Sequence, residues 1–264
     1  MNLFVMLGYI VAVNWFCLTV VWLVSVKIKD ASIIDIYWGI GFIVMAWACL
    51  LINLMHNPTS VSLSQWLINF MVTIWGFRLS LHLAVRNLGK GEDYRYVAMR
   101  KKSALDFRIF SYFRIFMFQG LLQIIVITPI LAMHYYPQEL GLGFFNYLGL
   151  ALWGVGIVYE TVADVQLVNF RSNPINQNAV LNSGLWRYSR HPNYFGDALQ
   201  WWAFFIFSLQ TGHYWGIIGP LLMMFIFLRL TIKLLEFPQT KKRPDYEEYV
   251  NTTNVFFPGP KKNQ

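Results

Sequence analysis

The residues best suited to chemistry lie in one short stretch, GLWRYSRHPNYFGDALQ, between Gly184 and Gln200. Pro192 suits the first turn of a helix, and Asn193 and Asp197 then lie four residues apart on one face of that helix. A strongly apolar segment, WWAFFIFSLQ, follows directly. The stretch therefore predicts a polar helix face that enters the membrane boundary.

Three cationic or potentially cationic side chains, Arg187, Arg190 and His191, precede this face. They lie just before the predicted helix begins and not along its polar face. We therefore expect Arg190 and His191 to have a structural or phosphate-binding role and not to donate a proton.

Other polar groups interrupt apolar runs elsewhere in the chain. Asp35 lies a few residues inside one run, and a carboxylate there is expensive enough to indicate function unless it forms a local cap or pair. Arg78, His82 and Arg86 follow one another at four-residue steps, which predicts one polar stripe on a helix. Arg86 can snorkel to the surface, whereas Arg78 and His82 lie deeper and could face Asp35, either in a cavity or as a structural ion pair.

A third polar face is predicted from Glu160, Asp164 and Arg171, which are spaced i, i+4 and i+11. Between the third and fourth apolar runs, the loop LGKGEDYRYVAMRKKSALDFR combines glycines with arginines that could hold a phosphate, including Arg95. Contact with anionic lipid explains the charge of this loop equally well, and its GKGED segment lacks the spacing of a P-loop.

The elements that must position these groups are membrane helices. The chain of 264 residues is 56% hydrophobic, 18% aromatic and only 13% charged, against roughly 25% charged in soluble domains. Because a helix needs about 20 apolar residues to cross a bilayer, we predict an all-α polytopic protein with seven transmembrane helices. The seven runs lie at about 3–26, 33–55, 62–86, 107–134, 143–168, 193–211 and 214–236.

The net charge of +8 is unevenly distributed, which favours a membrane surface over nucleic acid as its partner. The connections near residues 56–62, 134–143 and 211–214 contain no Lys or Arg, whereas the alternate connections and the C-terminus are basic. By the positive-inside rule the N-terminus lies outside and the C-terminus lies in the cytoplasm. We expect one domain, residues 1–264, in an integral membrane protein.

The polar groups on four of these helices all lie toward the predicted cytoplasmic side. This pattern predicts a cavity open to the cytoplasm that binds an anionic polar molecule and continues into an apolar space. The sequence has no Rossmann glycine motif, no H-E-x-x-H, no C-x-x-C and no G-x-S-x-G, and its scattered histidines predict no metal site.

The segments GLWRYSRHPNYFGDALQWW, WGFRLSLHLAVRNLGKGEDYRY and DYEEYVNTTNVFFP resemble the bacterial membrane proteins grouped with the steroid 5-alpha-reductases. The resemblance extends over about residues 30–258, and RHPNYFGD is its most specific part. The superfamily also contains sterol C14- and delta-7-reductases and isoprenylcysteine carboxyl methyltransferases. The resemblance implies a seven-helix bundle in the bacterial inner membrane that binds NADPH in its cytoplasmic half, with an active site that opens to the cytoplasm.

Asn193 and Asp197 match positions that hold the nicotinamide–ribose end of NADPH in these reductases, although the steroid enzymes commonly have Glu at the second. Asp164 and Arg171 match contacts to the adenosine and phosphate portion, and Glu160 replaces an Asn. Lys242 is assigned to phosphate on charge alone. The predicted cofactor-binding residues are Asn193, Asp197, Asp164, Arg171, Glu160, Arg95, Arg190, Tyr194, Lys242 and Tyr249.

The resemblance implies that NADPH reduces the C=C bond of an enone in a hydrophobic substrate, with a 3-oxo-delta-4-steroid as the expected class. An acid must then stabilise the enolate that forms. The Glu–Tyr pair of the steroid enzymes has no match here, so the role is assigned to Asp35 and His82, with Tyr37 or Tyr94 as hydroxyl donor. The alternative is an S-adenosylmethionine-dependent methyltransferase, whose branch shares the RHP-x-Y-x-G signature; Asn193 and Asp197 favour the reductase.

Overall fold

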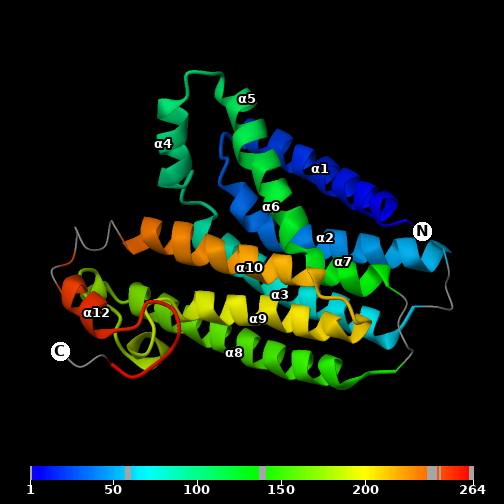
Figure 1. Ribbon diagram of the computed structural model, residues 1–264. Helices are drawn as coiled ribbons and strands as arrows, with labels where there is room; N and C mark the ends of the chain where they lie inside the picture. The colour runs from blue at the N-terminus through cyan, green and yellow to red at the C-terminus, as the bar shows by residue number, and fades with distance from the viewer. Residues whose placement is uncertain (1, 57–60, 137–140, 237–242, 244, 262–264) are drawn as a thin grey trace. The chain divides into compact units, whose positions relative to one another are not determined.

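The computed structural model describes residues 2–56, 61–136, 141–236, 243 and 245–261, and every regular element within them is a helix (Figure 1). The chain divides into two compact units, each of which is described by itself. Unit 1 comprises Met1–Gly143 and Ser208–Ile218, and unit 2 comprises Phe144–Phe207 and Gly219–Gln264. This division does not test the prediction of a single domain.

Unit 1 is built on three long helices and a fourth that is broken into pieces. Its elements are α1 (Leu3–Ile28), α2 (Ile33–His56), α3 (Leu63–Asn87), α4 (Tyr94–Lys102), α5 (Phe107–Ser111), η2 (Tyr112–Met117), α6 (Phe118–Val126), α7 (Thr128–Tyr135), η5 (Leu209–Thr211) and η6 (Trp215–Ile217).

The close packing of α2 on α3 sets the position of the first turn of α2, where Asp35 lies. The two helices lie side by side (Figure 1) and meet at Gly39 and Gly76. A Cβ atom added to Gly76 would lie 2.7 Å from the carbonyl oxygen of Gly39, so only glycine fits there. Small residues allow this approach between helix backbones in a membrane, where burial from water contributes nothing.

Unit 2 contains two long helices, α8 and α9, with 3₁₀ turns between them and a short helix near the C-terminus. Its elements are α8 (Phe144–Ser172), η3 (Pro174–Asn176), η4 (Gly184–Arg187), α9 (Pro192–Ser208), α10 (Ile218–Phe225), η7 (Ile226–Thr231) and α12 (Tyr246–Thr252). The turns η3 and η4 lie in the connector between α8 and α9.

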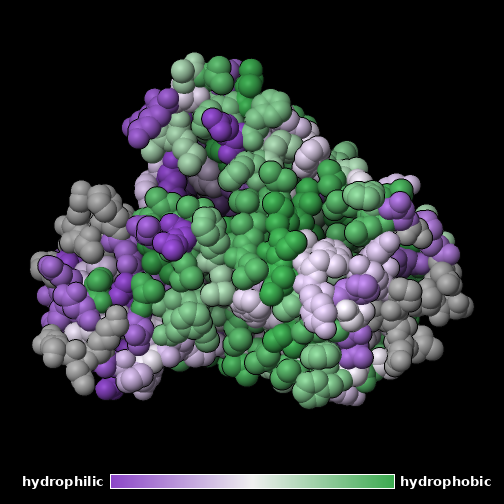
Figure 2. Space-filling model, viewed as in Figure 1, coloured by the Kyte–Doolittle hydropathy of each residue, from purple (hydrophilic) through white to green (hydrophobic). Residues whose placement is uncertain are grey.

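Six helices in the described part of the chain are long and apolar enough to cross a membrane, which confirms the membrane class. They are Leu3–Ile28, Ile33–His56, Leu63–Asn87, Phe107–Val126, Phe144–Ser172 and Trp215–Glu236. The remaining predicted run, the sixth at about 193–211, forms α9, which has 17 residues and spans about 25 Å at 1.5 Å per residue. Hydrophobic side chains cover much of the visible helix surface, while hydrophilic ones gather at α4 and around α12 (Figure 2).

Two local features differ from the sequence prediction. The predicted loop after α3 contains a helix, α4, because the Asp93 side chain accepts a hydrogen bond from the Arg95 amide and caps it. Gly89 and Gly91, with φ of 78° and 79°, form the turn before it. Two membrane helices also contain π-helical turns, η2 and η7, which apolar periodicity does not signal.

Candidate functional site

The predicted polar face of α9 meets the predicted acidic face of α8 within unit 2. The Asn193 side-chain amide donates to Asp164 Oδ1 over 3.1 Å, and the Gln200 amide donates to Glu160 Oε2 over 2.7 Å. Glu160, Asp164, Asp197 and Gln200 are all buried. The structure thus brings together Glu160, Asp164 and Asn193 of the predicted cofactor-binding residues and adds Gln200, while Asp197 lies one turn after Asn193 on α9.

Glycines explain how closely the two helices approach at this cluster. A Cβ atom added to Gly196 of α9 would lie 2.6 Å from the backbone nitrogen of Glu160 on α8. One added to Gly156 of α8 would lie 2.7 Å from Cγ of Gln200 and 2.9 Å from the Gly196 carbonyl oxygen. The backbones therefore touch between the polar side chains and hold them in a fixed arrangement.

The cluster is rich in hydrogen-bond acceptors. The side-chain oxygens of Asn193 and Gln200 are buried and have no hydrogen-bond partner within the described residues. Leaving such an atom unpaired costs about 1–3 kcal/mol. Two of these atoms beside the carboxylates of Glu160, Asp164 and Asp197 suit a ligand that presents hydroxyl and amide donors.

The Arg190–His191 pair, which precedes this face, holds the C-terminal segment of unit 2. Arg190 donates from Nη1 to the carbonyl oxygens of Val250 and Thr253, each over 2.8 Å, and from Nε to Glu236 over 2.7 Å. His191 Nε2 lies 2.9 Å from the same Glu236 carboxylate. These contacts agree with the structural role expected for the pair, and they occupy the guanidinium that was also assigned to the cofactor.

Tyr249 and Tyr194, two further predicted cofactor residues, are also part of this packing. The Tyr249 hydroxyl donates to the Trp186 carbonyl oxygen over 2.6 Å, and burial raises the pKa of that hydroxyl, so it remains a donor at neutral pH. Tyr194 stacks between His191 and Phe227, with ring centroids 5.7 and 4.9 Å away. The GLWRYSRHPNY stretch is therefore the anchor for the tail as well as the start of α9.

The cations that could bind the cofactor phosphates lie near the connector between α8 and α9. Arg171 lies exposed in the last turn of α8. Lys242 lies outside the described residues. Arg243, next to it in sequence, donates to the Gln177 carbonyl oxygen over 3.3 Å, and Arg187 is exposed in η4. Arginines thus surround the connector between α8 and α9.

A second polar cluster forms within unit 1 around Asp35. Arg95 Nη2 donates to Asp35 Oδ2 over 2.7 Å, and the Tyr96 hydroxyl donates to Asp35 Oδ1 over 2.7 Å. Gln119 on α6 donates in turn to the Tyr96 hydroxyl over 3.2 Å. The carboxylate lies 17% exposed at the start of α2 and is held by two residues of α4.

The charges around Arg95 are balanced on both sides. Arg95 Nε donates to Asp93 Oδ1 over 2.9 Å. Burial opposes the ionised form of Asp93, but hydrogen bonds from the Arg95 side chain and backbone outweigh it and lower the pKa of Asp93. Burial also raises the pKa of Tyr96, and the neighbouring Asp35 raises it further, so its hydroxyl keeps its proton at neutral pH.

The other predicted catalytic residues lie apart from the Asp35 carboxylate. Tyr94 is 63% exposed. Tyr37 packs against the core cluster of unit 1, and its buried hydroxyl has no hydrogen-bond partner in the described part of the chain. His82 lies half-buried on α3, and the side-chain partners of Asp35 are Arg95 and Tyr96 instead.

Tyr96 is the residue that sequence reasoning missed. It lies two positions after Tyr94, and in a helix this places the two rings on nearly opposite faces. The N-capping residue Asp93 is the signal that could have revealed the helix. No group of three or more His, Cys, Asp or Glu residues among those described is placed to hold a metal ion.

The chain matches the model of the family described as "Protein of unknown function (DUF1295)" over residues 21–253. The chain belongs to this family. It is also 28% identical to uncharacterized protein C594.04c of the fission yeast Schizosaccharomyces pombe, in an alignment that includes 90% of this chain and 76% of the yeast protein. No solved structure matches the chain.

Proposed function

We propose that this protein is a membrane-embedded, NADPH-dependent reductase that acts on the C=C bond of an enone in a lipid-like substrate. The resemblance of RHPNYFGD to the steroid 5-alpha-reductase group supports the reaction class and a 3-oxo-delta-4-steroid as substrate class. The observation that carries the proposal is the group of buried carboxylates Glu160, Asp164 and Asp197 beside Asn193, whose buried amide oxygen has no hydrogen-bond partner among the described residues.

The donors and acceptors of this face fit one part of NADPH. Ribose hydroxyls and the nicotinamide carboxamide carry O–H and N–H donors, which the carboxylates and the Asn193 oxygen would accept. The phosphates need cations instead. Arg171, Arg187 and Arg243 supply them around the connector between α8 and α9.

When bound, NADPH supplies the hydride. The part of this chain is to hold and orient it: Asn193 is fixed by its hydrogen bond to Asp164, and the contact between Gly156 and Gly196 keeps the side chains of α8 and α9 in register. The acid role of Asp35 stays a prediction, with the Tyr96 hydroxyl now the donor beside it.

A methyltransferase that uses S-adenosylmethionine is the second candidate. The buried carboxylates of Glu160, Asp164 and Asp197 favour it, because a cluster of negative charge suits the sulfonium and ammonium groups of that cofactor. Neutral amides between the carboxylates, and the arginines around the connector, favour NADPH.

The deciding experiment measures the melting temperature of the purified full chain in detergent with NADPH or S-adenosylmethionine. We expect NADPH to stabilise the parent, and Asn193→Ala to weaken its apparent affinity at least tenfold, or about 1.4 kcal/mol. Asn182→Ala, an exposed amide in the connector, is the matched control and should bind like the parent. Unchanged binding in Asn193→Ala would exclude the proposed site, and stabilisation by S-adenosylmethionine alone would establish the methyltransferase.

We further propose that α9, extended by η5, also crosses the membrane, as the sixth of seven crossings. Seven crossings place the N-terminus outside and the basic C-terminus in the cytoplasm. In this arrangement Asp164, Asn193 and the arginines near them lie at the cytoplasmic side, where NADPH is supplied. The membrane would be the inner membrane of a bacterial cell.

A further inference from the structure

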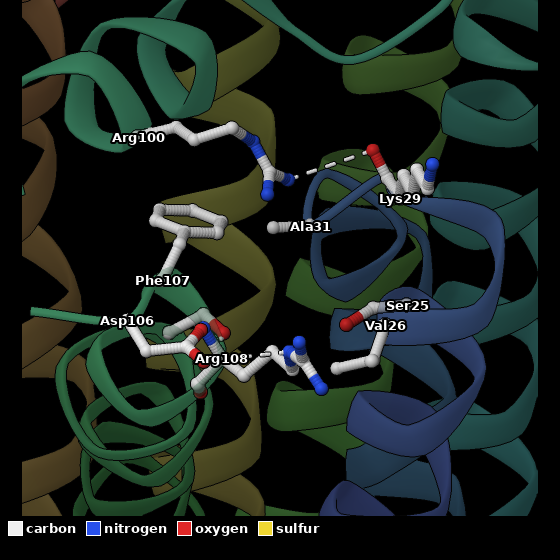
Figure 3. A pocket seen from close by; sticks show the side chains of 9 residues that line it. Ser25, Val26, Lys29, Ala31, Arg100, Asp106, Phe107 and Arg108 are labelled. Carbon is white, nitrogen blue, oxygen red and sulfur yellow. Dashed lines mark hydrogen bonds and ion pairs between the residues drawn. The ribbon is translucent and has the colours of Figure 1, made fainter.

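A separate pocket of about 330 Å³ lies in unit 1, where the end of α1 meets the start of α5 and the end of α4 (Figure 3). It is lined by Ser25, Val26, Lys29, Ala31, Arg100, Asp106, Phe107, Arg108 and Ser111. None of these residues belongs to the two polar clusters described above. The volume is within the usual range for small-ligand sites, roughly 300–1,000 Å³.

The charges on the pocket lining are mainly positive. The lining contains three cations, Lys29, Arg100 and Arg108, and one carboxylate, Asp106. Arg100 is held in place: it donates to both oxygens of Glu92, over 3.0 and 2.7 Å, and its guanidinium lies over the Phe107 ring at 3.9 Å. The charge of Arg100 is thus balanced by Glu92. The excess positive charge of the pocket lies on Lys29 and Arg108.

The side chains of Lys29 and Arg108 carry hydrogen-bond donors that no described residue accepts. The shortest distance between the Arg108 guanidinium and the Asp106 carboxylate is 3.6 Å, at Nε, and no hydrogen bond joins the guanidinium to any of the residues described. Its side chain extends toward Val26 (Figure 3). The ammonium group of Lys29 likewise lacks a partner within the described chain. Figure 3 shows the two cations on opposite sides of the pocket, with the Lys29 ammonium turned away from Arg108. The Lys29 side chain is long and flexible, so an anion with several oxygens could bind to both groups once that side chain turns inward.

The rest of the lining identifies the kind of anion. Phe107, Val26 and Ala31 are apolar, and the hydroxyls of Ser25 and Ser111 add polar groups between them. The pocket adjoins the ends of two candidate membrane helices, Leu3–Ile28 and Phe107–Val126. A ligand with a phosphate group next to an apolar part fits this lining. The phosphate would bind the cations, and the apolar part would contact Phe107, Val26 and Ala31.

We propose that this pocket binds the phosphate of an anionic ligand through Lys29 and Arg108. The source would be the headgroup of an anionic phospholipid or a small soluble phosphate. The inference does not rest on the proposed reductase activity, since it involves other residues in the other unit of the chain.

The test compares the melting temperature of the full chain in detergent with phosphatidylglycerol, phosphatidylcholine or inorganic phosphate added. The pocket variant is the double substitution Lys29→Gln and Arg108→Gln. The control, Lys101→Gln with Lys102→Gln, removes the same charge from exposed positions of α4 outside the pocket. Arg100 is left unchanged because its substitution would break its pair with Glu92.

We expect phosphatidylglycerol to raise the melting temperature of the parent and the control, and the pocket variant to lose at least four fifths of that shift. A lipid effect without an effect of inorganic phosphate identifies the headgroup as the source, and an equal effect of inorganic phosphate identifies a soluble phosphate. If both double variants lost the same share of the shift in melting temperature, the lipid effect would come from general attraction to surface charge, and the proposal would be overturned. Absence of a shift with every probe would also overturn it.

Discussion

At the scale of single residues, the two tyrosines of α4 differ in what they contact. The Tyr96 hydroxyl lies between Asp35 and Gln119, whereas Tyr94 is 63% exposed. Asp35 accepts its side-chain hydrogen bonds from Arg95 and Tyr96. Tyr96 therefore helps to stabilise the Asp35 carboxylate at the start of α2. Its hydroxyl links three separate elements, α2, α4 and α6.

Tyr96→Phe should therefore destabilise the protein by about 1–3 kcal/mol, because it removes a hydrogen bond to a partly buried carboxylate and leaves the Gln119 amide without its acceptor. Unfolding in detergent, followed by circular dichroism, measures this loss. Tyr94→Phe removes the same hydroxyl from an exposed ring and should change stability by less than about 0.5 kcal/mol. Equal effects of the two substitutions would contradict the assigned role of Tyr96.

Sequence reasoning predicted which residues share a helix face but not which faces meet. The spacing of Glu160 with Asp164, and of Asn193 with Asp197, follows from the helical period alone. That Asn193 bonds to Asp164 depends on how α8 packs against α9. The partner of Asp35 was assigned to α3 because Arg78 and His82 were deep in an apolar run. The structure supplies it from α4, a helix too short and too basic to show an apolar period.

At the scale of elements, glycines decide how α8 and α9 approach each other. Gly196 touches the backbone of α8 at Glu160, so the polar cluster exists only while the helices stay this close. Gly154, also on α8, has no atom within 4 Å of the position that a Cβ would occupy. The two glycines are therefore a matched pair: one lies at the helix contact and the other does not.

Gly196→Ala should cost about 1–3 kcal/mol through overpacking. It should also weaken NADPH binding, since separating the helices moves Asn193 away from Asp164. Gly154→Ala should leave binding unchanged and stability equal or slightly higher, because alanine favours a helix over glycine by up to about 1 kcal/mol. Melting curves with and without NADPH measure both effects. Tight binding by a destabilised Gly196→Ala protein would show that the helix contact supports folding only.

The helices themselves were predictable because long apolar runs leave few alternatives. Six of the seven predicted runs form candidate membrane helices. Five of these begin and end within a few residues of the predicted bounds. The fourth run, predicted at 107–134, is divided between the candidate span Phe107–Val126 and α7. The π-helical turns η2 and η7 were not predictable, because a π turn inserts one residue without changing the composition of the run.

At the scale of the whole molecule, the distribution of charge distinguishes six crossings from seven. The connector before α9 is flanked by Arg171, Arg187 and Arg190, while the connection after it, near residues 211–214, has no Lys or Arg. If α9 did not cross, a basic and a neutral connection would lie on the same side of the membrane. The positive-inside rule favours opposite sides.

Single cysteines on either side of α9 test this in intact cells. Tyr214→Cys, at a side chain 71% exposed, should react with a membrane-impermeant maleimide added from outside, while Asn182→Cys should react only after the membrane is permeabilised. The parent chain is the control for background labelling, since Cys49 is buried and Cys17 lies within α1. Labelling of both sites from the same side would show that α9 turns back within the membrane. With six crossings Asn193 would remain on the cytoplasmic side but the C-terminus would lie outside, and the contacts of Arg190 with Val250 and Thr253 could not form.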